Sequence, residues 1–592
     1  MRKEIVMLQD LMKIHDFDAY LVETSDFHQS EYVGEYFKCR AFLSGFTGSA
    51  GTLLVTQNSA YLWTDGRYFI QAENQLKDSG ITLMKMGQAG VLTLEEQMAS
   101  LFDDKFTFAC DGRTVSYSKL QGLKERFPSM NIVLNQDLVN EIWNNRPSLS
   151  CEKVFDYNVK YCGETRTSKI NRIREKMEEF NAESHLITSL DDIAWILNLR
   201  GHDVACNPVM LSYLVMTKTN CTLYCQLQAV DENLKEILEE DGVSLRDYYC
   251  ISEDLKLLDE GPLLVDQTKV NAFLISCLPK SIGRIFKPNP STLMKSIKNS
   301  VEIKNTKIAH IKDGVAVTKF MIWIKEEIQK RSITECEASD MLESFRRQQE
   351  HYLEPSFETI AAYGKNAAMM HYSAKPHQQA TLENKNLFLV DSGGQYLEGT
   401  TDITRTFALG DVDDLQKNHF TLALRSMLAL QNAHFLYGCI GLNLDILARG
   451  PLWDENLDYQ CGTGHGVGHL LNVHEGPNGF RWRMMPGRNE SAILEEGMIT
   501  TDEPGVYIPN SHGIRHENEL LCVKGEENEY GQFMHFEVIT FAPIDLDAID
   551  ESLLSFREKQ WLNHYHQQVR EVISPYLTEQ EKVMLEKYTR EI

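Results

Sequence analysis

Residues 387–402 read Leu-Phe-Leu-Val-Asp-Ser-Gly-Gly-Gln-Tyr-Leu-Glu-Gly-Thr-Thr-Asp, and this stretch decides how the carboxy-terminal half folds. Four apolar residues lead directly into Asp391, so its carboxylate is predicted in or at the end of a buried strand. A second strand is predicted over 400–409 and carries Asp402. The turn at 397–399 would join the two strands as an antiparallel hairpin and bring the aspartates side by side. Each aspartate alone is typical of a cap or a turn, but two close, buried carboxylates must be paired or bind a metal.

A glycine-rich segment supplies an imidazole. Residues 462–468 read Gly-Thr-Gly-His-Gly-Val-Gly and pack four glycines around His465, so the backbone there can approach a ligand closely. A lone histidine is more often a core side chain with a satisfied hydrogen bond, and the glycine density favours a ligand instead. Cys461, His465 and His469 are spaced four residues apart, so any pair could share a helical face. A Cys-His nucleophile pair at 461 and 465 is therefore an alternative.

Two glutamates follow in strand-like sequence. Glu503 is predicted at the end of a strand, before a Pro-Gly turn, and Glu517 on the next strand. A buried glutamate in a strand is costly without a partner, so we expect Glu517 to face a metal. Glu519 shares its face and is expected towards the edge. Arg515 lies on the same alternating face and could hold a ligand carboxylate in place.

Four carboxylates and one imidazole carry four negative charges, which two divalent cations would neutralise. Such a site makes a hydroxide from water near neutral pH, which points to a hydrolase with a two-metal centre.

Length and composition restrict the remaining possibilities. With 592 residues the chain is too long for one core, and 43% hydrophobic and 24% charged residues are ordinary for a globular protein. A net charge of −26 argues against nucleic acid or an anionic membrane as a partner. No signal peptide or membrane span is predicted. The 13 cysteines lack metal or disulfide spacing, which indicates reduced thiols and a cytoplasmic location.

The chain divides into three predicted α/β regions: an amino-terminal domain over 1–150, a second over 151–299 and a catalytic domain over 300–592. Residues 185–192 echo residues 20–26, which suggests a duplication of the first region in the second. Residues 45–51 look like a phosphate-binding loop but lack the following Lys-Ser/Thr, so they are interpreted as a turn that enters a strand.

The motifs resemble those of aminopeptidase P, the Xaa-Pro aminopeptidase of the pita-bread metallopeptidases, in its long three-domain form. Five motifs of the catalytic region carry the resemblance, namely residues 389–396, 399–406, 462–468, 471–477 and 501–505. Residues 26–32, 63–69 and 198–201 resemble the amino-terminal domains of that form, and 561–566 resemble its tail. The resemblance implies two creatinase-like α/β domains followed by a pita-bread catalytic domain.

The resemblance also implies the activity and the site. Peptides with proline at the second position would be the substrates. Asp391 would bind one metal, Asp402 and Glu517 would bridge both, and His465 and Glu503 would complete the second site. The metals would be manganese, with zinc or cobalt open because of the imidazole.

Three further residues match family positions. His371 and His474 resemble substrate-binding and proton-handling histidines, and Arg67 an arginine that reaches towards the substrate; taken alone, Arg67 would be a solvated turn residue. The match makes His465 the ligand and His469 a neighbour. Cys461 stands where many members carry histidine, and cysteine cannot supply the same charged hydrogen bond.

The resulting hypothesis is attack by a metal-bridging hydroxide, with Glu503 as general base and a histidine stabilising the oxyanion. A prolidase-like dipeptidase and a non-catalytic, peptide-binding pita-bread protein are the alternatives. Homodimerisation is expected from the family, with 453–458 as a plausible contact.

Overall fold

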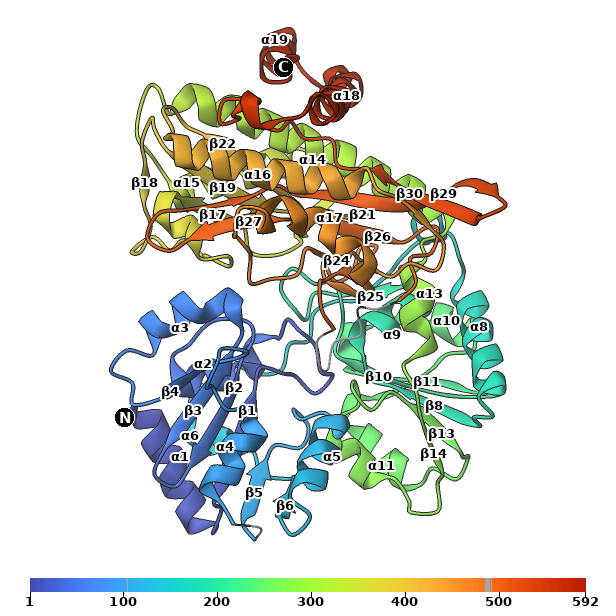
Figure 1. Cartoon of the computed structure of the whole chain (residues 1–592). Helices are drawn as coiled ribbons and strands as arrows, with labels where there is room; N and C mark the ends of the chain where they lie inside the picture. Colours follow the sequence, from blue (N-terminus) through green and yellow to red (C-terminus); the bar gives the residue numbers. More distant parts are fainter. Residues whose placement is uncertain (104, 485–489, 491) are drawn as a thin grey trace. The chain divides into compact units, whose positions relative to one another are not determined.

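The computed structural model describes residues 1–103, 105–484, 490 and 492–592. The chain forms two compact units (Figure 1). The first contains Met1–Asn158 and Glu164–Thr292, and the second contains Val159–Gly163 and Leu293–Ile592. Within the described part of the chain, no helix is long and apolar enough to cross a membrane.

The first unit begins with a six-stranded sheet in the order β4-β3-β2-β1-β5-β6. β1 runs antiparallel to β2, and β2 antiparallel to β3, whereas β1, β5 and β6 are parallel to one another. The strands are β1 (Ala19–Glu23), β2 (Thr52–Thr56), β3 (Ala60–Thr64), β4 (Thr82–Lys85), β5 (Thr107–Cys110) and β6 (Asn131–Val133).

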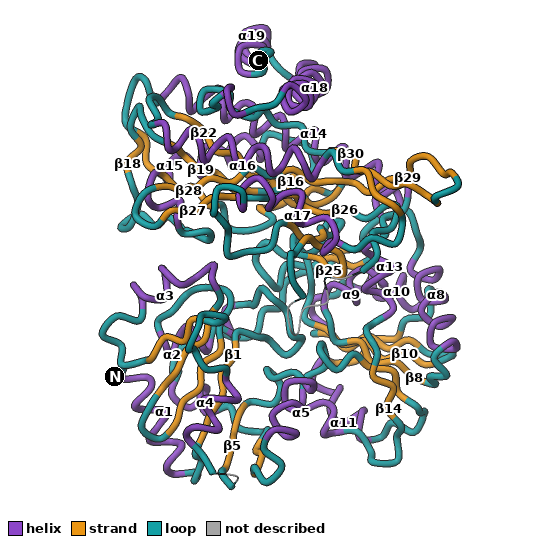
Figure 2. Tube along the Cα trace, in the orientation of Figure 1, coloured by secondary structure: helices purple, strands orange, loops and turns teal. Residues whose placement is uncertain are grey.

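Both faces of this sheet are covered by helices (Figure 2). Alternate side chains of β1 enter opposite cores, Tyr20 on one face and Leu21 on the other, as the period of two requires. The helices packed on the sheet include α1 (Lys3–Ile14), α2 (Cys39–Ser44), α3 (Phe69–Gln75), α4 (Leu94–Leu101), α5 (Tyr117–Arg126) and α6 (Leu138–Ile142).

Residues 45–51 form a turn that enters β2, as predicted. Gly45 ends α2 with a φ of 76°, a left-handed conformation that glycine adopts without strain. Arg40 donates to the carbonyl oxygens of Phe46, at 2.7 Å, and of Gly48, which fixes the turn from inside.

A second six-stranded sheet repeats this topology in the order β12-β11-β10-β8-β13-β14. Its antiparallel pairs are β8–β10 and β10–β11, and β8, β13 and β14 are parallel. The strands are β8 (Ser184–Ile187), β10 (Ser212–Thr217), β11 (Cys221–Cys225), β12 (Ser244–Asp247), β13 (Leu263–Val265) and β14 (Arg284–Phe286). β8 occupies the position of β1, which gives the sequence echo between 20–26 and 185–192 a structural counterpart.

The second unit is built around antiparallel sheets. A six-stranded sheet has the order β23-β30-β29-β26-β24-β25, and β17, β19 and β22 form a separate three-stranded sheet. The strands of the larger sheet are β23 (His434–Leu436), β24 (Gly464–Gly466), β25 (Glu475–Phe480), β26 (Ile499–Asp502), β29 (Asn518–Asn528) and β30 (Gly531–Val538). The smaller sheet contains β17 (Ile360–Tyr363), β19 (Leu387–Ser392) and β22 (Ile403–Ala408).

Long helices pack on these sheets. They are α14 (Ser300–Glu327), α15 (Glu335–Arg347), α16 (Asp414–Gln431), α17 (Gly441–Trp453), α18 (Phe556–Ile573) and α19 (Glu579–Tyr588). The short helix α7 (Val159–Cys162) also belongs to this unit, because Asn299 and Asn305 donate to its backbone carbonyls at 2.8–3.1 Å. No pattern in the sequence indicated this contact, which joins residues more than a hundred positions apart.

The predicted hairpin exists with two differences. β19 and β22 pair antiparallel with Asp391 opposite Thr404, so the second strand begins one residue after Asp402 rather than at 400. The connection also carries two short strands, β20 (Gly394–Tyr396) and β21 (Gly399–Thr400), which pair with each other and extend a third sheet through β16 (Tyr352–Pro355).

Candidate metal centre

Three predicted ligands meet at one point in the second unit. Single ligand atoms of Asp402, His465 and Glu517 all lie within 4.8 Å of one another. Nε2 of His465 is 3.5 Å from Oδ2 of Asp402. Asp402 directly precedes β22, His465 is the middle residue of β24, and Glu517 directly precedes β29. Each side chain is therefore fixed by a strand of a buried sheet.

Glu503 and Asp391 extend the cluster. Oε1 of Glu503 lies 3.4 Å from Nε2 of His465, and Glu503 directly follows β26, as predicted. Asp391 is the penultimate residue of the buried strand β19, and its charge acts on both Asp402 and Glu517. All five predicted ligands thus belong to one cluster.

The cluster holds more negative charge than its surroundings neutralise. Burial raises the pKa of Asp402 well above its usual range, and the charges of Asp391 and Glu503 raise it further. The pKa of Glu517 is raised well above its usual range by burial and then by Asp402 and Glu503. Arg515 is the cation in contact, and its guanidinium pairs with Oδ2 of Asp391. One guanidinium offsets only one of four carboxylates.

Two buried oxygens of the cluster make no hydrogen bond to a described residue: Oδ1 of Asp391 and Oε1 of Glu517. Buried carboxylate oxygens without partners are costly unless they coordinate a cation. Four carboxylates and one imidazole therefore fit a pair of divalent cations by both charge and donor type.

Neighbouring side chains fix the orientation of the carboxylates. Thr404 donates its hydroxyl hydrogen to Oε2 of Glu517 at 2.6 Å, and Arg515 donates from Nε to the same threonine oxygen at 3.1 Å. Nη1 of Arg515 donates to the hydroxyl of Tyr507. Arg515 therefore contacts one predicted ligand directly and orients a second through Thr404.

Glu519 corrects one expectation. It is fully buried in β29, a strand flanked by β26 and β30, and does not lie towards an edge. Its Oε1 accepts a hydrogen bond from the backbone N–H of Asp402 at 2.8 Å. Its Oε2 lies 3.0 Å from Nε2 of the buried His310 on α14. The alternation of the strand gave the correct face but not its neighbours, and His310 carried no sequence signal.

The glycines around His465 serve a different purpose from the one predicted. A Cβ atom on Gly464 would lie 1.8 Å from the carbonyl oxygen of Thr501, and one on Gly466 would lie 2.1 Å from that of Glu475. These glycines let β24 approach the backbones of β25 and β26 rather than a ligand. The close packing holds His465 against Glu503.

The residues four positions on either side of His465 lie outside the group formed by Asp402, His465 and Glu517 among the described residues. His469 is buried, with Nδ1 3.0 Å from the hydroxyl of Thr306 and Nε2 3.1 Å from the carbonyl of Tyr161. Burial, followed by the charge of Glu503, raises the pKa of Cys461 to about 11. A thiol that stays protonated is a weak nucleophile, which disfavours the Cys-His alternative.

Two more predicted residues lie beside the cluster. The His474 ring packs edge-on against the His465 ring, with centroids 4.2 Å apart. His371 is half-buried and follows Met370, whose carbonyl oxygen lies 3.4 Å from Nη2 of Arg515.

Arg67 lies in the first unit. Its guanidinium pairs with Asp65, at 2.7 and 2.8 Å, and its Nη1 is 3.9 Å from Glu31. The side chain is only 11% exposed, so the description as a solvated turn residue is wrong.

A buried arginine ties the carboxy-terminal helix to the strands of the cluster. Arg405 in β22 donates to the carbonyl oxygens of Thr404 (2.8 Å) and Glu517 and, at 2.8 Å, to the hydroxyl of Tyr565 in α18. The backbone on both sides of the cluster is thereby fixed to the last part of the chain.

The fold and this site define a metallopeptidase of the creatinase and prolidase type. Residues 304–524 match metallopeptidase family M24, and 532–592 match the C-terminal region of that peptidase. Residues 5–142 and 145–302 each match a creatinase/prolidase N-terminal domain. The expected fold class, two creatinase-like domains followed by a pita-bread domain, is confirmed.

Full-length relatives identify the family more closely. Aminopeptidase P2 of Arabidopsis thaliana is 38% identical over 95% of this chain and 84% of its own length. A probable Xaa-Pro aminopeptidase P of Laccaria bicolor is 36% identical, over 97% of this chain and 91% of that protein. The crystal structure of X-prolyl aminopeptidase from Caenorhabditis elegans, described as a cytosolic enzyme with a di-nuclear active site, is similar with a TM-score of 0.95 and 30% identity; the match covers 100% of this chain and 99% of that one. The chain belongs to the Xaa-Pro aminopeptidase (aminopeptidase P) family.

Proposed function

We propose that this chain is a two-metal Xaa-Pro aminopeptidase that removes the first residue of peptides with proline at the second position. The observation that carries the proposal is the buried cluster of four carboxylates and His465, with oxygens that lack protein partners. The relatives named above support it, because the similarity extends over nearly the whole length of each.

Asp391 would hold one cation, Asp402 and Glu517 would lie between the two, and His465 and Glu503 would complete the second position. The oxygen-rich donor set suits manganese, and the imidazole also accommodates zinc or cobalt. When bound, the two cations act as Lewis acids and lower the pKa of water, so that a nucleophile forms near neutral pH.

Glu503 is the residue that handles the nucleophile's proton. Its side chain is 20% exposed, compared with 6% for Asp402 and 10% for Asp391. Its Oε2 lies 4.0 Å from Nε of Arg515. Its carboxylate is therefore placed to accept a proton as a general base.

Recognition of the substrate lacks the backbone hydrogen bond that the proline nitrogen cannot donate. Proline has no backbone N–H, so a site that grips the substrate as a strand loses a donor at the scissile bond. His371 and His474 would bind the substrate around that bond, and a histidine or Glu503 would protonate the leaving proline nitrogen. Arg67 is proposed as a further substrate-binding residue on the basis of the matching family position.

The test is hydrolysis of an Xaa-Pro-Xaa tripeptide by the metal-loaded enzyme and its Glu503→Ala variant. We expect turnover to be lost while circular dichroism stays unchanged. Glu529→Ala, at an exposed turn between β29 and β30, is the matched control and should retain activity. A Glu503→Ala enzyme with near-normal rates would refute the proposal. An Xaa-Pro dipeptide assayed in parallel distinguishes a dipeptidase.

A homodimer is proposed through the end of α17. Trp453 and Trp482 are 39% and 44% exposed and pack edge to face with ring centroids 6.0 Å apart. Exposed tryptophans in contact are typical of protein interfaces. Sedimentation should give a dimer mass that falls to a monomer mass in Trp453→Ala. A dimer that persists in this variant would place the contact elsewhere.

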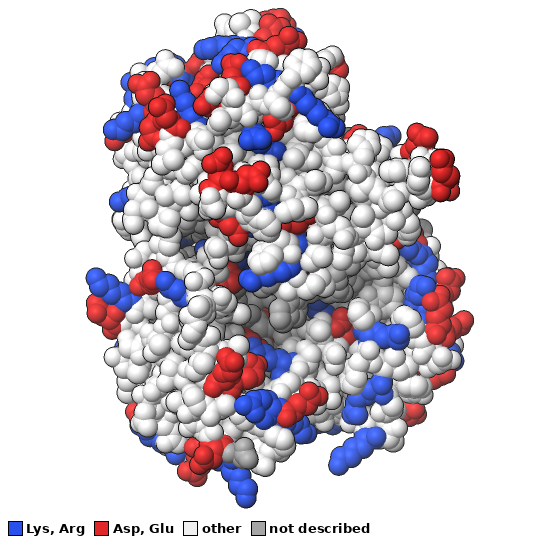
Figure 3. Space-filling view, in the orientation of Figure 1, with Lys and Arg blue, Asp and Glu red and all other residues white. Residues whose placement is uncertain are grey.

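A cytoplasmic location is proposed as well. The described cysteines are all free, and the similar nematode enzyme is a cytosolic one. Acidic and basic side chains are interspersed over the face shown in Figure 3, which is typical of a solvated surface.

A further inference from the structure

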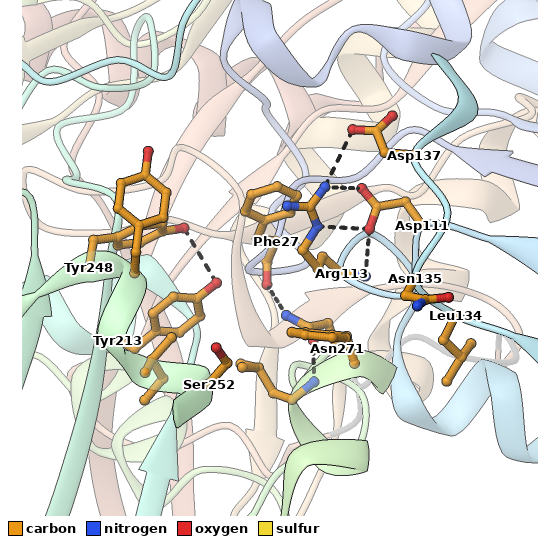
Figure 4. A pocket seen from close by; sticks show the side chains of 14 residues that line it. Phe27, Asp111, Arg113, Leu134, Asn135, Asp137, Tyr213, Tyr248, Ser252 and Asn271 are labelled. Atoms are coloured by element: carbon orange, nitrogen blue, oxygen red, sulfur yellow. Dashed lines mark hydrogen bonds and ion pairs between the residues drawn. The ribbon is translucent and has the colours of Figure 1, made fainter. Parts of the chain in front are cut away.

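A pocket in the first unit has no role in the proposed reaction. Its volume is about 400 Å³, within the range of about 300–1,000 Å³ that is usual for small-molecule sites. Figure 4 shows that its walls come from both α/β sheets of this unit: Asp111 and Arg113 face Tyr213 and Tyr248. All of its lining residues belong to the first unit.

The first wall lies at the carboxyl ends of parallel strands. Phe27 follows β1, Asp111 directly follows β5, and Leu134 directly follows β6. β2 pairs with one edge of β1, and β5 pairs with the other edge. The direction in which strands are added to the sheet therefore reverses between β1 and β5. Ligands of open α/β sheets bind in the crevice at such a reversal, outside the carboxyl ends of the strands.

The second wall repeats this arrangement. Tyr248 directly follows β12, and Asn271 comes after β13. Tyr213 is the second residue of β10, which runs antiparallel to β8 and therefore starts at the carboxyl end of that strand. Asn271 joins the walls, because its side-chain amide donates to the carbonyl oxygen of Phe27 at 2.8 Å. Two sheets of the same topology thus contribute their ligand-binding ends to one pocket.

The carboxylates that line the pocket, Asp111 and Asp137, are neutralised by Arg113 in the lining and by Arg146 outside it. Arg113 donates to both carboxylate oxygens of Asp111 at 2.9 Å, and its Nη2 is 3.3 Å from Asp137. Asp137 also pairs with Arg146 at 2.7 Å. Two carboxylates and two guanidiniums leave no net charge, so the pocket favours an uncharged ligand.

Phosphate groups are disfavoured for a second reason. The helices that begin beside the pocket, α5 and α12 (Ala272–Cys277), have side-chain caps. Ser116 accepts from the N–H of Lys119, and Asn271 accepts from the N–H of Leu274. Backbone N–H groups that bind phosphate at other helix starts are therefore already occupied here.

The walls present flat surfaces. The guanidinium of Arg113 stacks 4.4 Å from the ring centre of Phe27, and Asp111 fixes its plane. Tyr213 and Tyr248 stack with centroids 5.0 Å apart, and their hydroxyls are 3.3 Å apart. Planar rings pack on aromatic side chains and on guanidinium planes.

Polar groups remain open at the edge of these surfaces. Nη1 of Arg113 and the side-chain amide of Asn135 make no hydrogen bond to a described residue. Together they offer donors and one acceptor, the pattern that reads the edge of a heterocycle.

We propose that this pocket binds an uncharged, planar nitrogen heterocycle of the nucleobase or nucleoside class. The ring lies between the Arg113–Phe27 stack and the tyrosine wall, and its edge is bound by Arg113 and Asn135.

The test is titration of the full-length protein with adenosine, guanosine and uridine, followed by calorimetry and ligand-observed NMR. We expect at least one nucleoside to bind with a dissociation constant on the order of 10–500 µM. The nucleoside should bind at least tenfold more weakly to Asn135→Ala and to Tyr249→Ala; Tyr249 also lines the pocket, with its ring centre 5.4 Å from that of Tyr248. Both side chains are exposed, so neither substitution disturbs a core. Tyr530→Ala, which alters an exposed tyrosine in the second unit, is the matched control.

Three results would overturn the proposal. The absence of binding for all three nucleosides up to about 5 mM excludes the ligand class. Binding that is unchanged in both pocket variants places the site elsewhere. Tighter binding of adenosine monophosphate than of adenosine contradicts the charge argument. These readouts use no peptide hydrolysis, so they do not depend on the proposed peptidase activity.

Discussion

Two groups of acidic side chains in this molecule differ in how far neighbouring arginines neutralise them. In the first unit, Asp111 and Asp137 are both neutralised by arginines at hydrogen-bond distance. In the second, Asp402 and Glu517 are buried beside two further carboxylates, and the neighbouring guanidinium of Arg515 contacts Asp391. The paired carboxylates of the first unit need no further cation. The carboxylates of the second unit carry excess negative charge, which bound cations would neutralise.

The strongest test of this contrast is Asp402→Asn. Loss of a ligand charge between the two cation positions should lower kcat/KM for an Xaa-Pro tripeptide by about 10³-fold or more. Glu529→Gln, at the exposed turn between β29 and β30, should leave kcat/KM unchanged. Activity of Asp402→Asn within tenfold of the parent would mean that this carboxylate is not a ligand.

Arg515→Met should have the next largest effect. The substitution removes the partner of Asp391 and the donor to Thr404, so the ligand carboxylates lose their orientation. Metal affinity, measured by competition with a chromogenic chelator, should fall about 10–100-fold. Arg557→Met, on the exposed start of α18, is the control. Unchanged metal affinity would reduce Arg515 to a packing role.

In protein stripped of metal by a chelator, two isosteric substitutions should change the free energy of unfolding in opposite directions. Asp402→Asn removes an uncompensated buried charge and should raise the free energy of unfolding by about 1–3 kcal/mol. Asp111→Asn breaks the pair with the partly exposed Arg113 and should lower it by about 1 kcal/mol. Calorimetry in the presence of a chelator would measure both. Shifts of the same sign would contradict the contrast between the two groups.

The excess negative charge of the cluster should also make the stability of the metal-free protein depend on pH. A carboxyl group with a raised folded pKa stabilises the fold fully at pH values below its unfolded pKa, near 3.8 for Asp402 and 4.5 for Glu517. This contribution is lost as the pH rises through the folded values. The melting temperature in chelator should therefore fall as the pH rises above about 4.5, and less in Asp402→Asn and Glu517→Gln. Added manganese should oppose the fall.

Cys461 gives the smallest expected effect. Because its pKa is raised to about 11, its thiol should react with iodoacetamide at pH 7.5 more slowly than free glutathione does. Peptide mapping of the alkylated protein measures this rate. Rapid labelling that abolishes activity would restore the Cys-His alternative.

The sequence predicted the components of the metal cluster better than their surroundings. Strand alternation and the turn at 397–399 were enough to place Asp391 and Asp402 together, because both signals are local. Glu519 was misplaced because alternation identifies a face, whereas its exposure depends on β30 and on α14, which are distant in sequence.

Two other features were inaccessible from one sequence. The glycines at 464 and 466 indicated a close approach, but only the paired strands reveal that the approaching atoms are carbonyl oxygens of the sheet. The pocket of the first unit depends on Arg113 and Tyr213, which come from different sheets and share no motif. Patterns within one segment could be interpreted from the sequence, whereas contacts between segments far apart in the sequence could not be predicted.

The bond from Arg405 to Tyr565 has a consequence for biosynthesis. The ribosome makes the last of the five acidic and imidazole groups, Glu517, well before it makes α18. Until that helix emerges and docks, the arginine behind the cluster lacks one of its acceptors. The backbone beside Glu517 therefore gains this support only after α18 has been synthesised and has docked, later than the ligands themselves.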